Sequence, residues 1–147
     1  MNFITKAKNY VYITTPYLIV GNEMMAVLEL AAKTGTDVRI ITPHVPDKWY
    51  VHMMTQASYA QLIAAGVKIY EYTPGFIHAK TFVADDQTAT VGTVNLDYRS
   101  LFMHFECGVW IYRSQAVMQV KEDFLKTLKE CHQVTLEECS KPNLVVR

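Results

Sequence analysis

The stretch from His78 to Asn95, HAKTFVADDQTATVGTVN, decides the fold of this chain. Its first part is rich in β-branched and aromatic residues, and Pro74-Gly75 and Asp85-Asp86 are turn signals at its two ends. The sequence therefore predicts a strand from Phe76 to Asp85. The apolar run from Thr88 to Val91 follows closely enough to return beside that strand, so the stretch is predicted to form a β-hairpin.

The hairpin carries side chains that suit an anion. His78 and Lys80 are two positions apart, and residues two apart on a strand share one face. Thr93 and Asn95, at the end of the hairpin, offer a hydroxyl and an amide to the non-bridging oxygens of a phosphate. Gly92 permits a close approach of the backbone. The pattern therefore predicts a phosphoryl-transfer site.

A carboxylate follows at Glu106, the second residue of the apolar run FECGVWIY. A buried carboxylate there would accept a proton from Nδ1 of His78, fix its tautomer and leave Nε2 free as a nucleophile. Taken alone, Glu106 has the simpler interpretation of a strand-edge carboxylate. Asp97 and Arg99 have two interpretations, a loop ion pair or a polar scaffold around Asn95.

Two motifs together carry a resemblance to a known family. The pattern H-x-K-x-x-x-x-D at His78, Lys80 and Asp85, followed by G-T-x-N from Gly92 to Asn95, resembles the HKD motif of the phospholipase D superfamily. Most of the chain, residues 3–130, further resembles the C-terminal half of bacterial cardiolipin synthases. The segments that carry this second resemblance are ITTPYL (13–18), DVRIITP (37–43), AAGVKIYEYTPGFIHAK (64–80) and NLDYRS (95–100).

The resemblance implies roles for individual residues. The implied catalytic residues are His78, Lys80, Asp85, Asn95 and Glu106, and the implied phosphate-binding residues are His78, Lys80, Thr93 and Asn95. In this scheme His78 is the nucleophile or its acid–base partner, Glu106 orients it, and Asp85 is a structural member of the motif. No cofactor and no metal ion are implied.

The implied activity is phosphatidyl transfer, in which two phosphatidylglycerol molecules give cardiolipin and glycerol through a phosphohistidine intermediate. The resembled enzymes carry two motifs, whereas this chain has one. We therefore expect a C-terminal catalytic half that needs the N-terminal half of the same enzyme or a second copy of this chain, and that is weakly active or inactive alone. The full-length protein is expected at the cytoplasmic face of the bacterial membrane, with a phospholipid substrate, and this piece is expected to be soluble.

Two other functions stay open at this stage. One is a single-motif phosphodiesterase, acting on nucleic acid or phospholipid as a homodimer, and the other is a non-catalytic half-domain that binds an anion. Lys and Arg total 14, as do Asp and Glu, so the net charge is zero and the basic excess of a nucleic-acid-binding protein is missing. Nucleic acid is therefore the less favoured partner.

Composition also limits the remaining classes. No apolar run reaches the roughly 18 residues of a membrane span. The three cysteines form no C-x-x-C pair, and their odd number argues against a disulfide framework and for a reducing compartment. The other histidines have no zinc-type spacing, so we expect no metal cofactor; they are His44, His52, His104 and His132.

Helix and strand patterns alternate along the chain, which is typical of an α/β fold. We expect a mixed, mostly parallel sheet with helices on both faces, forming one phospholipase D-like half-domain over residues 1–131 and a poorly anchored tail over 132–147. The remaining predicted strands are 10–17, 38–43, 67–72 and 105–113. The predicted helices are 22–35, 49–65 and 115–131, after a short helical stretch within 3–10.

Overall fold

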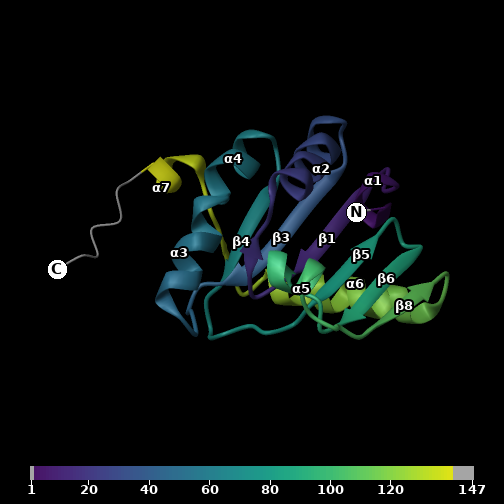
Figure 1. Ribbon diagram of the computed structural model, residues 1–147. Helices are drawn as coiled ribbons and strands as arrows, with labels where there is room; N and C mark the ends of the chain where they lie inside the picture. The colour runs from purple at the N-terminus through teal and green to yellow at the C-terminus, as the bar shows by residue number, and fades with distance from the viewer. Residues whose placement is uncertain (1, 141–147) are drawn as a thin grey trace.

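Apolar residues recur at strand and helix spacing, and the resulting elements build one α/β structure. The computed structural model describes residues 2–140 (Figure 1). The strands of its seven-stranded sheet are β1 (Tyr10–Thr14), β3 (Asp37–Pro43), β4 (Lys68–Tyr72), β5 (Thr81–Ala84), β6 (Thr88–Gly92), β8 (Gly108–Tyr112) and β9 (Cys131–Gln133). The helices are α1 (Asn2–Thr5), α2 (Asn22–Lys33), α3 (Trp49–Ala57), α4 (Tyr59–Ala64), α5 (Tyr98–Phe102), α6 (Gln115–Leu128) and α7 (Leu136–Ser140). A separate small sheet pairs β2 (Leu18–Ile19) with β7 (Leu96–Asp97).

The order of the strands across the main sheet is β8-β6-β5-β1-β3-β4-β9. The early strands β1, β3 and β4 are parallel, whereas β5, β6, β8 and β9 join the sheet by antiparallel pairing. The mixed sheet is thus confirmed, and so is the antiparallel hairpin of β5 and β6. Parallel pairing is limited to the first three strands, because every later strand is antiparallel to the neighbour on which it is added.

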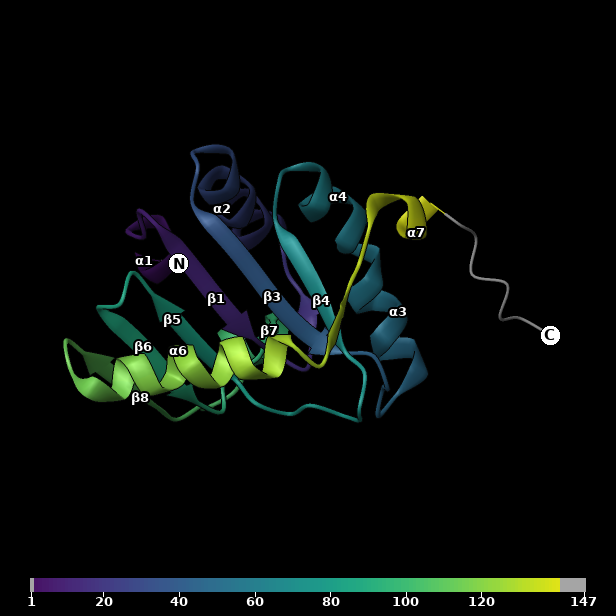
Figure 2. The same cartoon turned by 180° about the vertical axis from the view of Figure 1, so that it is seen from behind.

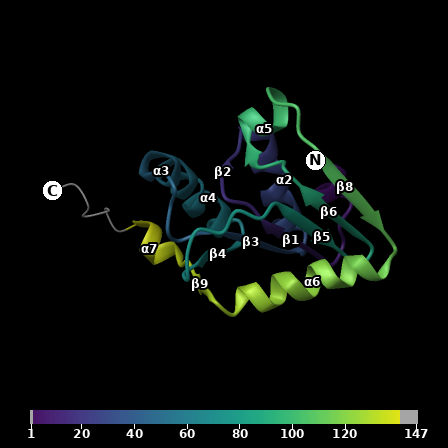
Figure 3. The same ribbon diagram turned by 90° about the horizontal axis from the view of Figure 1, so that it is seen from below.

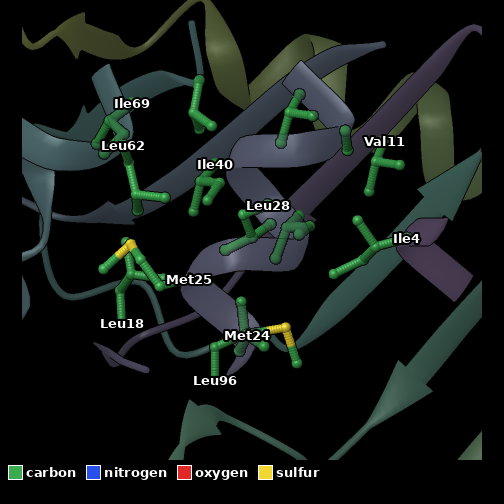
Figure 4. Packing of buried hydrophobic residues seen from close by; sticks show 14 of the residues in the cluster. Ile4, Val11, Leu18, Met24, Met25, Leu28, Ile40, Leu62, Ile69 and Leu96 are labelled. Atoms are coloured by element: carbon green, nitrogen blue, oxygen red, sulfur yellow. The ribbon is translucent and has the colours of Figure 1, made fainter. Parts of the chain in front are cut away.

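Strand β1 is buried along its whole length because helices cover both faces of the sheet. Val11 and Ile13 belong to the core under α2 and α4, part of which Figure 4 shows. Tyr12 points to the opposite face, where its ring stacks on Phe124 of α6 with centroids 4.8 Å apart. Figures 2 and 3 show α6 along this second face, on the side of the sheet away from α2. Helices on both faces are therefore confirmed.

Several predicted boundaries agree with the structure and others do not. Gly35 and Gly66 follow α2 and α4 with φ values of 99° and 102°, as expected of glycines that end helices. The single helix predicted over 49–65 is two helices that meet at Ser58. The strand predicted from Phe76 begins only at Thr81, and β8 is mostly exposed although a buried strand was expected.

The segment after His132 is better anchored than expected. Strand β9 pairs with the edge of β4, and Val134 and Cys139 pack against the main core as far as helix α7. The prediction of a poorly anchored tail is therefore wrong up to Ser140, and its remainder, residues 141–147, lies outside the described residues. Within residues 2–140, no helix combines the length and the apolar character needed to cross a bilayer.

Asp85 connects the hairpin to the centre of the sheet. Its carboxylate accepts hydrogen bonds from the backbone N–H groups of Lys8, Asn9 and Tyr10, with distances of 2.7, 2.8 and 3.0 Å. Asp85 and Asp86 form the turn between β5 and β6 with φ values of 54° and 58°, which aspartate tolerates better than most residues. The expected structural part played by Asp85 thus corresponds to three specific bonds at the start of β1.

These bonds predict a difference between two neighbouring substitutions. Asp85→Ala removes three charge-assisted hydrogen bonds, whereas Asp86→Ala removes a part-buried bond from the Tyr10 hydroxyl and an exposed bond from Lys121. Both replace a residue with positive φ, so the backbone strain is similar in the two variants. We expect Asp85→Ala to lower the free energy of unfolding by about 1–3 kcal/mol more than Asp86→Ala, measured by urea denaturation. Equal losses would contradict the structural assignment.

Candidate active site

His78 and Lys80 lie in the irregular segment 76–80 that leads into β5. The His78 side chain is exposed, and its ring lies 5.5 Å from that of Phe76 between centroids. Lys80 is only 9% exposed, and its Nζ donates a hydrogen bond to the carbonyl oxygen of His78 at 2.7 Å. The two residues therefore do not share a strand face, yet both line the same hollow.

Asn95 is held in place by the small β2–β7 sheet. Leu96 pairs with Leu18, and the Leu96 N–H donates to the hydroxyl of the fully buried Thr15 at 3.2 Å. The Asn95 amide Nδ2 contacts Oγ of Ser100 at 3.1 Å. Sequence reasoning missed both hydroxyl groups. The spacing of Asp97 and Ser100 was a usable signal, because Asp97 caps α5 by accepting from the Ser100 N–H at 2.6 Å.

The predicted phosphate-binding residues surround one open hollow of about 450 Å³, lined by His78, Lys80, Thr93 and Asn95. The imidazole, the ammonium and the amide come from segments on either side of the β5–β6 hairpin. A hollow with these groups has the polarity and the donor types that a phosphate requires. The geometry therefore suits anion binding next to a histidine.

Glu106 is engaged differently from the expectation. Its Oε2 accepts a short hydrogen bond from the Thr93 hydroxyl, which in turn accepts from the N–H of Cys107 at 3.0 Å. Within residues 2–140 no hydrogen bond joins Glu106 to His78. The single hydroxyl hydrogen of Thr93 is used by Glu106, so in this arrangement Thr93 orients the carboxylate instead of donating to a phosphate. The Thr93 bond also lowers the pKa of Glu106.

The contact between Thr93 and Glu106 depends on Gly92. Gly92 pairs with Gly108 across β6 and β8, and a Cβ at Gly92 would collide with the carbonyl oxygen of Cys107 and lie 2.6 Å from Cα of Gly108. Only glycine allows this approach without a backbone shift. The predicted close approach at Gly92 is confirmed, and its partner is the segment that carries Glu106.

Lys80 supplies the positive charge of the hollow. Burial lowers the pKa of its ammonium, while the nearby carboxylates of Glu106 and Asp97 raise it to a smaller extent. A partly desolvated ammonium interacts more strongly with an anion than an exposed one does. The cost is that the free protein holds a cation with little water around it.

The histidines other than His78 lie away from the hollow or lack a lysine two residues further along the chain. His44 Nδ1 lies 2.7 Å from the buried Glu71, and His132 Nε2 lies 2.9 Å from Glu138, beside a second hollow of about 500 Å³. His104 is nearer to the motif, with Nδ1 4.0 Å from Oε1 of Glu106. Among the described residues, no group of three or more His, Cys, Asp or Glu could hold a metal ion.

Residues 1–128 match the model of a family described as the PLD-like domain of cardiolipin synthase. The chain belongs to this family. The resemblance of the HKD pattern to the phospholipase D superfamily is thereby confirmed, and the family segment includes the whole hollow. It ends at the last residue of α6, before β9 and α7.

Relatives of this PLD-like domain include much longer proteins. The chain is 47% identical over 144 residues to an uncharacterised protein of Streptococcus mutans, covering 98% of this chain and 31% of that protein. It is 41% identical over 144 residues to a cardiolipin synthase of Clostridium perfringens, covering 98% of this chain and 30% of that enzyme. A cardiolipin synthase of Halalkalibacterium halodurans is 39% identical over 137 residues, which are 93% of this chain and 27% of that enzyme. The chain thus spans about three tenths of these relatives.

Solved structures share the fold at low identity. The phospholipase D family member Nuc from Salmonella typhimurium superimposes with a TM-score of 0.78 at 18% identity, over 90% of this PLD-like domain and 86% of Nuc. A phosphatidylserine synthase from Haemophilus influenzae gives a TM-score of 0.74 at 15% identity, over 90% of this chain and 35% of that one. The phospholipase D fold is therefore confirmed.

The close approach at Gly92 predicts that the paired glycines Gly92 and Gly108 differ in how well they tolerate replacement by alanine. Gly92→Ala forces β6 and β8 apart, whereas a Cβ at Gly108 meets its nearest atom at an ordinary 3.6 Å. We expect Gly92→Ala to cost about 1–3 kcal/mol of unfolding free energy and Gly108→Ala less than about 1 kcal/mol. Chemical denaturation of both variants measures this. If Gly92→Ala were as stable as Gly108→Ala, the described contact with Cys107 would be wrong.

Lys80 is predicted to matter for binding and not for stability. Lys80→Met removes a partly desolvated cation, so we expect an unchanged or higher unfolding temperature together with lost binding of inorganic phosphate. The matched control Lys68→Met breaks an exposed ion pair with Asp37 and should leave phosphate binding intact. Because the Lys80 pKa is lowered, its ammonium loses its proton at a lower pH than an ordinary lysine does. As the pH is raised, phosphate affinity should therefore begin to decline at a lower pH than an ordinary lysine would give. Calorimetric titration and thermal unfolding measure the two effects, and full phosphate binding by Lys80→Met would exclude this residue from the site.

Proposed function

We propose that this chain is the C-terminal catalytic half of a cardiolipin synthase-like phosphatidyltransferase that forms cardiolipin and glycerol from two phosphatidylglycerol molecules. The observation that carries the proposal is the convergence of His78, Lys80 and Asn95 on one hollow. Cardiolipin synthases among the relatives support the lipid substrate. The zero net charge makes a polyanionic nucleic acid a less suitable substrate.

In the proposed reaction, Nε2 of His78 attacks the phosphorus of one phosphatidylglycerol. The bond between phosphorus and the glycerol oxygen breaks, and glycerol leaves with a proton from the histidine of the other half. A hydroxyl of a second phosphatidylglycerol then attacks the phosphohistidine, gives its proton back to that histidine and releases His78. Lys80 and Asn95 stabilise the charge of the non-bridging oxygens in both steps.

The second histidine must come from a partner. His78 is exposed, and neither His44 nor His132 lines its hollow. His104 is the nearest alternative inside this chain because of its position 4.0 Å from Glu106. It lacks a lysine two residues further on and lies in an exposed segment. The partner is proposed to be the N-terminal half of the same enzyme.

A large apolar surface beside the hollow supports such a partner. We name it the α5–β8 surface, and its exposed residues are Tyr98, Phe102, Met103, Phe105, Trp110 and Tyr112. Figure 3 shows α5 and β8 on the margin of the molecule, next to the end of β6. Contiguous exposed apolar residues of this kind are typical of interaction sites. Glu106 lies in the segment between α5 and β8, so this surface is connected to the hollow through the hydrogen bond between Glu106 and Thr93.

A symmetric homodimer with water as acceptor is the second candidate function. Its support is the superposition of this chain on 86% of Nuc, a phospholipase D family member of similar length. A two-fold axis would place two copies of His78 across one phosphate. In that arrangement the reaction is hydrolysis of a phosphodiester.

The proposal predicts that the isolated monomer turns over poorly because it holds one motif histidine. The test incubates the purified chain with phosphatidylglycerol vesicles across a dilution series, with its mass followed by light scattering and its products by mass spectrometry. Cardiolipin with glycerol identifies transfer, and phosphatidic acid with glycerol identifies hydrolysis. We expect activity only after addition of the N-terminal half of a family member.

Two variants make this assay decisive. His78→Ala should abolish any activity that the complemented chain shows, whereas His104→Ala should retain it. Robust turnover by a demonstrable monomer would overturn the need for a partner. If that turnover also disappeared in His104→Ala, the missing proton donor would be His104.

A further inference from the structure

The Asn95 side chain in the free protein is turned the wrong way for an anion. Its Nδ2 contacts Ser100 Oγ at 3.1 Å, while its Oδ1 is buried and has no hydrogen-bond partner. The Nδ2 group, which could donate to an anion, is therefore occupied by Ser100, and the unpaired group of this hollow-lining residue is a buried carbonyl oxygen. A carbonyl oxygen repels a phosphate, whereas an amide N–H attracts it.

Ser100 is built to accept either end of the amide. A serine hydroxyl both donates and accepts hydrogen bonds, so it pairs with Nδ2 as an acceptor or with Oδ1 as a donor. Its position is fixed, because it is 7% exposed and its backbone N–H is held by Asp97. A rotation of the Asn95 amide by half a turn would thus keep a bond to Ser100 and exchange the polarity of the free end.

We propose that Ser100 is a positioning residue for the anion site: when phosphate binds, its hydroxyl donates to Oδ1 of Asn95, and Nδ2 of Asn95 turns to the phosphate. This inference rests on the proposed phosphate site and adds a residue that does not touch the substrate. In the turned state both ends of the amide have partners, which removes the unpaired buried oxygen of the free state. Unpaired buried polar atoms are costly, so the exchange favours binding.

The rotation also links Asn95 to Glu106. Besides the stronger bond from Thr93, a hydrogen bond from Ser100 lowers the pKa of Glu106 in the free protein. The hydroxyl has one hydrogen, so donating it to Asn95 withdraws it from Glu106. Phosphate binding and the carboxylate environment are therefore coupled through one side chain.

The test is a double-mutant cycle on the 147-residue chain, with inorganic phosphate as the probe and NMR of the Asn95 side-chain NH₂ group as the readout. Ser100→Ala keeps the backbone bond to Asp97, so α5 retains its cap. We expect this variant to bind phosphate about three- to tenfold more weakly, the effect of one lost hydrogen bond. Ser100→Thr retains the hydroxyl and should restore the affinity. Ser58→Ala, which removes a hydroxyl that donates to the Leu18 carbonyl oxygen at 3.5 Å, should have no effect.

The double-mutant cycle distinguishes a Ser100 that positions Asn95 from a Ser100 that only supports the fold. In an Asn95→Ala background, Ser100→Ala should cause no further loss, because the side chain that it orients is gone. In the wild type, phosphate should shift the Asn95 NH₂ resonances, and in Ser100→Ala this shift should be smaller at saturation.

Four results would overturn the inference. Wild-type affinity in Ser100→Ala would exclude any positioning by the hydroxyl, and equal losses from Ser100→Ala with and without Asn95 would reduce Ser100 to a structural residue. In both cases the phosphate site itself would stand. If Asn95→Ala bound phosphate as tightly as the wild type, or the wild type bound none, the proposed site would fail together with this inference.

Discussion

The three hydrogen bonds that the Asp85 carboxylate accepts from the start of β1 are the junction on which the rest of the site depends. They fix the register of β5 against β1, in which Val11 pairs with Ala84 and Thr14 with Thr81. A slip by one residue would exchange the two faces of β5 and turn Lys80 away from the hollow. Asp85, which follows the end of β5, thus controls the positions of Lys80 and His78, which precede its start.

A second junction brings in the carboxylate. Gly92 and Gly108 let β6 and β8 approach closely, and this approach delivers Glu106 to Thr93. The hollow is therefore assembled by these two strand pairings together with the small β2–β7 sheet that places Asn95, and not by contacts among its own side chains. Because few side chains within the hollow are paired with one another, His78 and Lys80 keep donors and lone pairs for a ligand. That arrangement leaves binding groups available at the cost of a partly desolvated cation.

The sequence was sufficient for features that depend on local chemistry. Helix α2 follows from its apolar spacing and Gly35, and the residues that line the hollow follow from their types and spacing in the HKD pattern. Features that depend on distant partners were not predictable. Residues 76–79 have strand-like composition, but β1 ends at Thr14, opposite Thr81, so β1 offers them no residue to pair with. Whether Glu106 meets His78 or Thr93 depends on the separation of β6 and β8, which no local pattern encodes. The anchoring of β9 likewise needed the free edge of β4, far away in the chain.

The two edges of the main sheet differ in a way that limits assembly. One edge ends in β9, only three residues long and continued by helix α7, which leaves little backbone for strand addition. The other ends in β8, five residues long and flanked by exposed aromatic side chains. A sheet with one edge strand available for pairing can add one neighbouring sheet and no more. The neighbour pairs through its own available edge, so the joined pair has none left. An edge of this kind favours a closed pair over an open, growing row of sheets.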